Sequence, residues 1–270
     1  MPAPPAPQAA PLPPPAAIRL DGVPQQGVAL RGIAPAGTQS LSLDGQSVPI
    51  APNGHFLIAF DRDAPPSAVL TDQLADGRTI TRQLTVAPGH WHIEHVDAPY
   101  LGGAKTSAEF RRRRGGELEQ IAAARAQHNQ SDGWEQNFIW PIAARISSPF
   151  GSQRIYRGGH KGSYHSGVDL AAAKGRVYVA PADGVVVLAA TEPFTLGGKL
   201  LIIDHGMGLN SAFLHSSKLL VKLGDHVKQG QPIGLVGATG RTTGPNLYWS
   251  VKWNGARIDP TTLVKAKVVV

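Results

Sequence analysis

Two stretches of the chain consist of short apolar and β-branched runs separated by turn dipeptides. In the first, between residues 17 and 88, the runs are VALRG, SLSL, FLIAF, AVLTD and TITRQLTV. Asp44-Gly45, Asn53-Gly54 and Asp76-Gly77 are typical of hairpin turns, because Gly and Asn adopt positive φ at little cost. Turn signals about ten residues apart indicate a small all-β sandwich. We therefore predict a β-sandwich over residues 17–88.

The second stretch, residues 137–270, has longer apolar runs and many glycines. Its expected strands are RVYVAPADGVVVLAA, KLLIIDHG, LNSAFLHSS and GLVGATG. The segment GDHVKQGQPIGLVG resembles the hairpin of biotinyl and lipoyl carrier domains. A carrier needs an exposed lysine at the hairpin tip, typically beside methionines, and the chain has only two, Met1 and Met207. The hairpin therefore indicates an architecture shared with the carrier domains, and the lack of such a site argues against a carrier function.

Residues 89–136 are predicted to link these two β regions. The segment GHWHIEHV holds three histidines, His90, His92 and His95, which raises the alternatives of a metal site or a linker strand. In an extended strand His95 points away from the other two, so we favour the linker strand. A helix is predicted from Thr106 to about Gln130, with Thr106 and Glu109 as a capping box. Gly115-Gly116 is expected to break or kink it.

Charge and composition narrow the function classes. The 270-residue chain has no cysteine, so neither a disulfide nor a thiolate metal site can form. Its formal charge of +7 favours anionic partners. The run Arg111 to Arg114 is interpreted as a solvated helix face, or alternatively as a polyanion contact, and no nucleic-acid motif accompanies it. Residues 1–16 carry eight prolines and indicate an extended tether. Neither a membrane-spanning apolar run nor a signal peptide is visible.

The motif HSGVDLAA is the first candidate for chemistry. His165 and Asp169 are four residues apart, an even offset that places both on one face of a strand. Imidazole and carboxylate are both common zinc ligands. By itself, the pair is equally consistent with a structural hydrogen bond.

Further motifs give this pair a context. HSGVDLAAAKGRVYVAPADGVVV, FLHSSKL and GDHVKQGQPIGLVGATGRTTGPNLYWSV follow one another in the order and spacing of the lysostaphin/LytM-like zinc metallopeptidases, which are peptidoglycan endopeptidases. The resemblance covers about residues 138–263. It implies a mainly β chain whose C-terminal domain is a lysostaphin-like β-sheet or barrel, built as a duplicated hybrid motif. The preceding sandwich and helix also resemble the N-terminal part of some Gram-negative members.

The resemblance implies roles for eight positions. In the family, zinc is held by residues that match His165, Asp169 and Tyr248, and its catalytic histidines match His215 and Asn246. The substrate groove would include Arg241, Thr243 and Gly244. A metal-bound water would attack the peptide carbonyl.

Two of these positions depart from the family's pattern, because GPNLYWSV has Asn246 and Tyr248 where Gly-Pro-His-Leu-His is usual. A tyrosine must lose a proton of pKa about 10 to bind zinc, and Asn246 cannot act as a general base. Loss of Tyr248 as a ligand leaves two protein ligands, below the three of a catalytic zinc site. We predict weak or absent zinc and an inactive protein that binds peptidoglycan or regulates a cell-wall hydrolase. The alternative is an active zinc endopeptidase that cleaves peptidoglycan cross-links. Either function implies a periplasmic or otherwise extracytoplasmic location.

Overall fold

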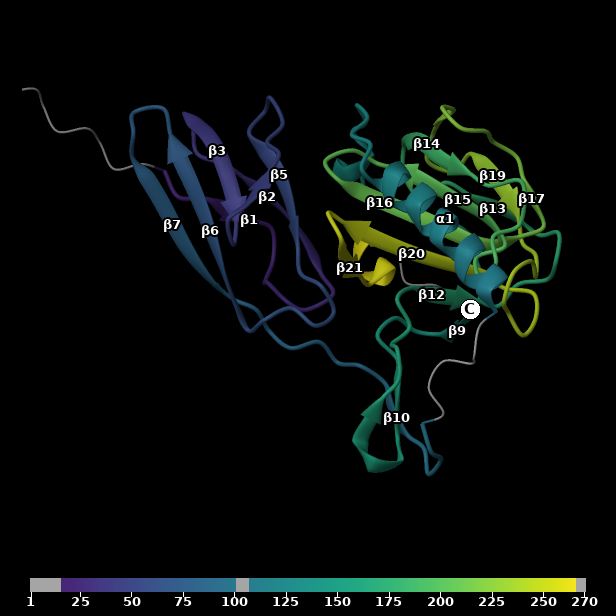
Figure 1. Ribbon diagram of the computed structural model, residues 1–270. Coiled ribbons are helices and arrows are strands. Elements are labelled where there is room, and N and C mark those ends of the chain that lie inside the picture. The colour runs from purple at the N-terminus through teal and green to yellow at the C-terminus, as the bar shows by residue number, and fades with distance from the viewer. Residues whose placement is uncertain (1–15, 101–106, 266–270) are drawn as a thin grey trace, which may run out of the picture.

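The computed structural model describes residues 16–100 and 107–265 and is built mainly from β-strands (Figure 1). The predicted tether over residues 1–16 lies outside the described residues except for Ala16. The domain boundaries at 17–88, 89–136 and 137–270 remain a prediction.

The N-terminal region is a sandwich of two sheets, as the sequence predicts. One sheet has the order β1-β2-β5 and the other the order β4-β3-β6-β7. Buried side chains from both sheets, such as Leu30, Phe56, Leu41 and Leu70, belong to one apolar cluster. The strands are β1 (Arg19–Leu20), β2 (Ala29–Ile33), β3 (Thr38–Leu43), β4 (Gln46–Val48), β5 (His55–Ala59), β6 (Ser67–Leu74) and β7 (Thr79–Thr85).

The predicted turns close hairpins of this sandwich. Asp44 and Gly45 both have positive φ, 48° and 79°, between the paired residues Leu43 and Gln46. This is the geometry of a type I′ turn, which matches the twist of the flanking strands. Gly77 also has positive φ between β6 and β7. The local turn chemistry therefore specifies the register of these strands.

The C-terminal region is organised around one large sheet. Its order is β18-β14-β15-β16-β20-β12-β9, and β21 pairs with β20. Among the described residues the sheet ends at β18 and β9 without pairing them, so it is an open sheet and the predicted alternative of a closed barrel is wrong. The strands are β9 (Ile146–Ser148), β12 (Val168–Leu170), β14 (Gly184–Ala189), β15 (Lys199–Asp204), β16 (Leu209–Ser216), β18 (His226–Val227), β20 (Leu247–Trp253) and β21 (Ala256–Ile258).

Two small sheets flank the large one. The carrier-like hairpin supplies β19 to a sheet of order β13-β19-β17, and the histidine-rich segment supplies β8 to a sheet of order β11-β10-β8. In this second sheet β8 pairs with β10 in parallel, with Ile93 opposite Gln153. The remaining elements are β8 (Ile93–His95), β10 (Gln153–Tyr156), β11 (His160–Lys161), β13 (Val177–Val179), β17 (Lys218–Leu219), β19 (Pro232–Leu235), and the 3₁₀ turns η1 (Gly133–Glu135), η2 (Arg157–Gly159) and η3 (Pro260–Leu263).

The helix α1 (Ala108–Arg125) lies across one face of the large sheet (Figure 1). Its N-cap is Ser107, whose hydroxyl accepts from the backbone N–H of Phe110. The cap is therefore Ser107 and not the predicted Thr106, which itself lies outside the described residues. The helix also continues unbroken through Gly115-Gly116.

Tertiary contacts explain why the two glycines do not interrupt the helix. The buried Glu117 carboxylate accepts from the backbone N–H and the hydroxyl of Thr195 at 2.6 and 2.7 Å. One turn later, Ile121 and Ala124 pack on an apolar cluster that includes Val187 and Ile202. These contacts outweigh the roughly 1 kcal/mol that each glycine costs relative to alanine.

The sandwich contacts the C-terminal region through polar and aromatic groups. Arg31 donates to the backbone carbonyls of Trp134 and Gln136 at 2.9 and 2.6 Å. The Arg257 backbone N–H donates to the Asp61 carboxylate at 2.8 Å. The Arg31 bonds tie β2 to the segment around Gly133–Glu135, and the Asp61 bond ties the loop after β5 to β21. Within the described residues, α1 is too polar to span a membrane, and the shorter helices are not long enough.

Candidate functional site

Three of the five predicted zinc and catalytic positions lie in contact with one another. His165 Nε2 lies 3.1 Å from Asp169 Oδ2, and the Asn246 side-chain amide donates to Asp169 Oδ1 at 2.9 Å. Asp169 is on β12, which pairs with β20, and Asn246 comes directly before β20. His165 precedes β12, so it reaches Asp169 from the loop and not along a strand face. One carboxylate oxygen of Asp169 is therefore hydrogen-bonded to Asn246, and the other lies against the His165 ring.

A residue that the sequence analysis did not single out positions Asn246. The Thr242 hydroxyl contacts both the Gly244 carbonyl, at 3.0 Å, and Asn246 Oδ1, at 3.2 Å. The Asn246 backbone N–H also donates to the Gly237 carbonyl. With its oxygen against Thr242, the amide presents its NH₂ group to Asp169. Asn246 is therefore fixed as a hydrogen-bond donor at this position.

The hydroxyl of Tyr248 is hydrogen-bonded to Ser166, the residue next to His165. The Tyr248 hydroxyl is 2.9 Å from Ser166 Oγ. The ring packs edge-on against His165, with centroids 5.3 Å apart, and it covers Gly167, where an added Cβ would lie 2.8 Å from Tyr248 Cζ. Burial raises the pKa of Tyr248, and hydrogen bonds with Ser166 and Ser250 offset only part of that rise. At neutral pH the side chain is therefore a phenol and not a phenolate.

His215 also packs edge-on against Tyr248, with ring centroids 6.4 Å apart. It is the seventh residue of β16 and has a φ of +67°, which is unusual for a residue other than glycine. Its Nδ1 lies 2.8 Å from the Thr239 carbonyl. Because a carbonyl only accepts, Nδ1 carries the proton and Nε2 of the neutral ring is an acceptor. The strained backbone and this hydrogen bond fix the imidazole in one orientation.

The donor set does not fit a catalytic zinc ion. Such a site needs three protein ligands, and of the three positions that match the family's ligands only His165 and Asp169 carry an imidazole or carboxylate. Within the described part of the chain, no three His, Cys, Asp or Glu residues are grouped so as to hold a metal. A zinc-bound histidine also donates its second ring nitrogen to an acceptor, whereas His165 Nδ1 is buried without a hydrogen-bond partner. The site therefore lacks a third zinc ligand, and its histidine lacks the second hydrogen bond that a zinc-bound imidazole makes.

The predicted groove residues follow in the loop before β20. The Arg241 backbone N–H donates to the Leu196 carbonyl at 3.0 Å, and the Arg241 and Thr243 side chains are exposed. Gly240 is required by the fold, since its φ is +75° and an added Cβ would lie 2.3 Å from Gly198 N. At Gly244 an added Cβ would meet nothing within 4 Å. Crowding therefore explains why residue 240 is a glycine, but it does not explain the glycine at position 244.

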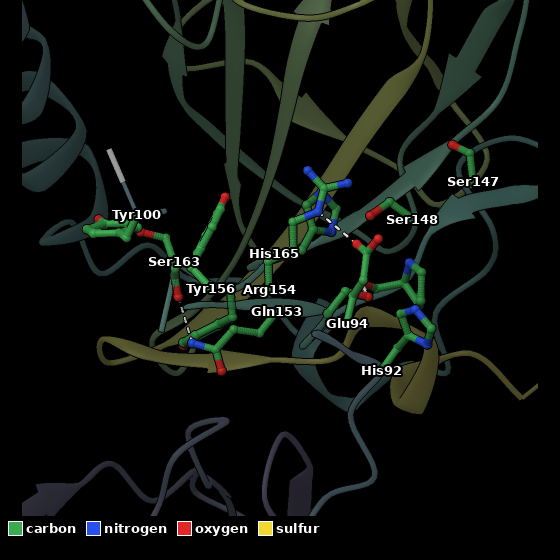
Figure 2. Close-up of a pocket in the computed structure, with 14 residues that line it drawn as sticks. His92, Glu94, Tyr100, Ser147, Ser148, Gln153, Arg154, Tyr156, Ser163 and His165 are labelled. Carbon is green, nitrogen blue, oxygen red and sulfur yellow. Dashed lines mark hydrogen bonds and ion pairs between the residues drawn. The ribbon is translucent and has the colours of Figure 1, made fainter. Parts of the chain in front are cut away.

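A cleft of about 700 Å³ opens beside His165 (Figure 2). The sheet β11-β10-β8 forms one wall, so His92 and Glu94 of the histidine-rich segment line it together with Arg154. Arg154 Nε donates to Glu94 Oε2 at 2.7 Å. The aromatic lining comes from Tyr100, Tyr156 and Tyr164. The sequence pattern gives no sign of this cleft, because it depends on the pairing of β8 with β10.

An open β-sheet with a His–Asp pair on β12, a histidine at the end of β16 and the Gly-Pro-x-Leu-x motif entering β20 defines a lysostaphin/LytM-like domain. Residues 163–260 match the model of Peptidase family M23. These residues thus form a Peptidase M23 domain, which confirms the resemblance read from the sequence.

Two curated relatives and one solved structure extend this match. The chain is 38% identical over 124 residues to peptidoglycan DD-endopeptidase ShyA of Vibrio cholerae, covering 46% of this chain and 28% of that protein. It is 35% identical over 147 residues to an uncharacterized metalloprotease of Haemophilus influenzae, and this match covers 53% of this chain and 31% of that protein. The matched regions thus span less than a third of either relative. A crystal structure from Pseudomonas aeruginosa assigned to peptidase M23 superposes with a TM-score of 0.70 at 27% identity, covering 91% of this chain and 97% of that one.

Proposed function

We propose that this chain is a peptidoglycan-directed M23 protein that does not cleave the wall, and that it binds the wall or regulates a cell-wall hydrolase. The observation that carries the proposal is the closed contact group at the family's metal position. Asp169 Oδ1 accepts from the Asn246 amide, Asp169 Oδ2 lies 3.1 Å from His165 Nε2, and the Tyr248 hydroxyl is bonded to Ser166. No third ligand is presented to a metal there.

The groups that remain supply too little for peptide hydrolysis. Cleavage requires an acidified water, a base to take its proton and a donor for the developing oxyanion. Asn246 can donate but cannot accept a proton. His215 has an acceptor nitrogen, Nε2, but loss of a single oxyanion donor or base typically costs about 100- to 1,000-fold. Without metal the rate falls further, because the attacking water keeps a pKa near 15.7.

The surroundings of this group support a retained binding role. The cleft beside His165 combines tyrosine rings with the Arg154–Glu94 ion pair, a lining suited to a peptide that carries both charges. Arg241 and Thr243 are exposed at the groove. A formal charge of +7 favours an anionic wall polymer. Peptidoglycan as ligand implies a periplasmic or otherwise extracytoplasmic location.

The rival function is zinc-dependent cleavage of peptidoglycan cross-links. It is favoured by the retention of His165, Asp169 and His215 and by the DD-endopeptidase names of several relatives. It requires that Tyr248 turn from Ser166 and lose its proton, against the burial that raises its pKa.

A pull-down with purified sacculi tests the proposed groove. Arg241→Ala and His215→Gln are expected to reduce the bound fraction severalfold, since both lie at the groove. Arg19→Ala, an equal charge change on the exposed edge of the sandwich, should leave binding unchanged. If neither groove variant alters binding, and the protein stimulates no co-purifying wall hydrolase, the proposal is wrong.

A further inference from the structure

A row of polar side chains crosses the face of the large sheet that α1 covers. Asp204 of β15 pairs with Asn210 of β16, Asn210 pairs with Lys252 of β20, and Lys252 pairs with Arg257 of β21. Directly opposed residues of antiparallel strands project to the same face. Arg125, the last residue of α1, lies over this row.

These elements enclose a small pocket of about 220 Å³. Its polar lining comes from Arg125, Asn210, Lys252 and Asn254, and Gly208 and Gly255 complete the wall. The pocket lies four residues along β20 from Tyr248, or about 13 Å at the rise of a strand. It is therefore separate from the cleft beside His165.

Two cations at this pocket have no counter-ion. Within the described residues, neither the Arg125 guanidinium nor the Lys252 ammonium makes a hydrogen bond or an ion pair, and Arg125 Nε is buried without a partner. The carboxylate nearest along the row is already bonded, because Asp204 accepts from the Asn129 backbone and side chain and from the Gly206 backbone. Two adjacent cations thus lie partly buried with no anion between them.

The remaining charges around Lys252 do not compensate it. Burial, together with Arg125 and Arg257, lowers the pKa of Lys252 to about 8, against an opposing effect of Asp61. Asp61 is itself bonded to the Arg257 backbone N–H, and the Arg257 side chain donates to the Tyr164 hydroxyl at 2.8 Å. A cation held partly out of water without a partner is destabilising, and a fold does not ordinarily retain two of them side by side for stability alone.

We infer that the pocket between α1, β16 and β20 is a binding site for a small oxyanion, held by Arg125 and Lys252. A guanidinium presents parallel N–H donors to two oxygens of one carboxylate or phosphate group. Lys252 adds a compact charge from the opposite wall. A pocket of about 220 Å³ has room for one such group. The ligand is therefore a carboxylate or phosphate group, either free or at the end of a larger molecule.

Isothermal titration of the full chain tests this site with two probes, inorganic phosphate and N-acetylalanine. The expected result is saturable binding of at least one probe at one site per chain. Lys252→Gln and Arg125→Gln should each weaken it at least tenfold. Lys218→Gln, an exposed lysine outside the pocket, makes the same charge change and should have no effect. The probe that binds more tightly distinguishes a phosphate source from a peptide carboxylate.

A second measurement uses only the native chain, in case a variant fails to fold. At pH 8.5 Lys252 is largely neutral, and an oxyanion beside it raises its pKa. Binding should therefore take up protons, and the heat should differ between buffers of different ionisation enthalpy. The proposal is wrong if neither probe binds. It is also wrong if the native chain and all variants bind with the same affinity and binding takes up no protons, because the two cations then have only a structural role.

Discussion

Glu117 anchors α1 to the large sheet, and its replacement gives a graded test of that docking. One carboxylate oxygen accepts from the Thr195 backbone N–H at 2.6 Å, and the other accepts from the Thr195 hydroxyl at 2.7 Å and from Arg114 at 3.2 Å. A hydrogen bond to a charged group contributes about 1.5–3 kcal/mol. Glu117→Ala removes all three and leaves a buried N–H unpaired, so we expect a loss of about 3 kcal/mol. Glu117→Gln keeps the shape but loses the charge, so about 1 kcal/mol is expected.

The effect of pH follows from the pKa of Glu117. Burial alone would raise this pKa, but the hydrogen bonds from Thr195 and Arg114 outweigh burial and lower it below its ordinary 4.5. A lowered folded-state pKa adds stability above pH 4.5 that is lost as the pH falls through the folded value. The advantage of the native chain over Glu117→Gln should therefore disappear in acid.

Urea denaturation measures these free energies, and amide hydrogen exchange of α1 reports local undocking. Glu119→Ala is the matched control, because Glu119 lies on the same helix and is exposed. It should change stability by less than about 0.5 kcal/mol. If Glu117→Ala is as stable as the control and α1 exchanges no faster, the reasoning about this anchor is refuted.

Two further predictions concern the fold around the site. Gly240→Ala should destabilise the chain, because of its φ of +75° and an added Cβ 2.3 Å from Gly198 N, while Gly244→Ala should be tolerated; equal unfolding midpoints in urea would contradict this. His205 is fully buried, and burial lowers its pKa to about 4. Because the pKa of His205 is lower in the folded chain than its unfolded value of 6.5, the neutral imidazole contributes to stability at neutral pH, and this contribution is lost as the pH falls. The free energy of unfolding should therefore be about 2 kcal/mol smaller at pH 5 than at pH 7. Replacement of His205 by Gln should flatten this dependence, and an unchanged slope would exclude His205 as its source.

Local signals in the sequence account for much of the fold. The Asp44-Gly45 turn and the apolar runs of β5, β15 and β16 specify hairpins and buried strands through residue chemistry alone. The choice of Ser107 over Thr106 as the helix cap was not predictable, because both side chains can cap. The unbroken helix at Gly115-Gly116 depends on Glu117 reaching Thr195, 78 positions further along the chain.

The resemblance to the lysostaphin/LytM-like family predicts that His165, Asp169, His215, Asn246 and Tyr248 form one site, but it does not predict how these residues contact one another. It could not show that the Tyr248 hydroxyl bonds to Ser166, 82 positions away in sequence, or that Asn246 donates to Asp169. The pocket at Lys252 was missed for the same reason, since it forms only where α1 lies over β16 and β20. Such contacts depend on the packed arrangement of distant segments.

Zinc content tests the central claim, that the site lacks a catalytic metal, most directly. The purified native chain is dialysed against a mild chelator and its zinc is measured by elemental analysis, beside the double variant Asn246→His and Tyr248→His. The account predicts far less than one zinc per native chain and a clear gain in the double variant, which restores the two histidines to a group that still has His165, Asp169 and His215. Stoichiometric zinc in the native chain, lost in His165→Ala, would contradict it.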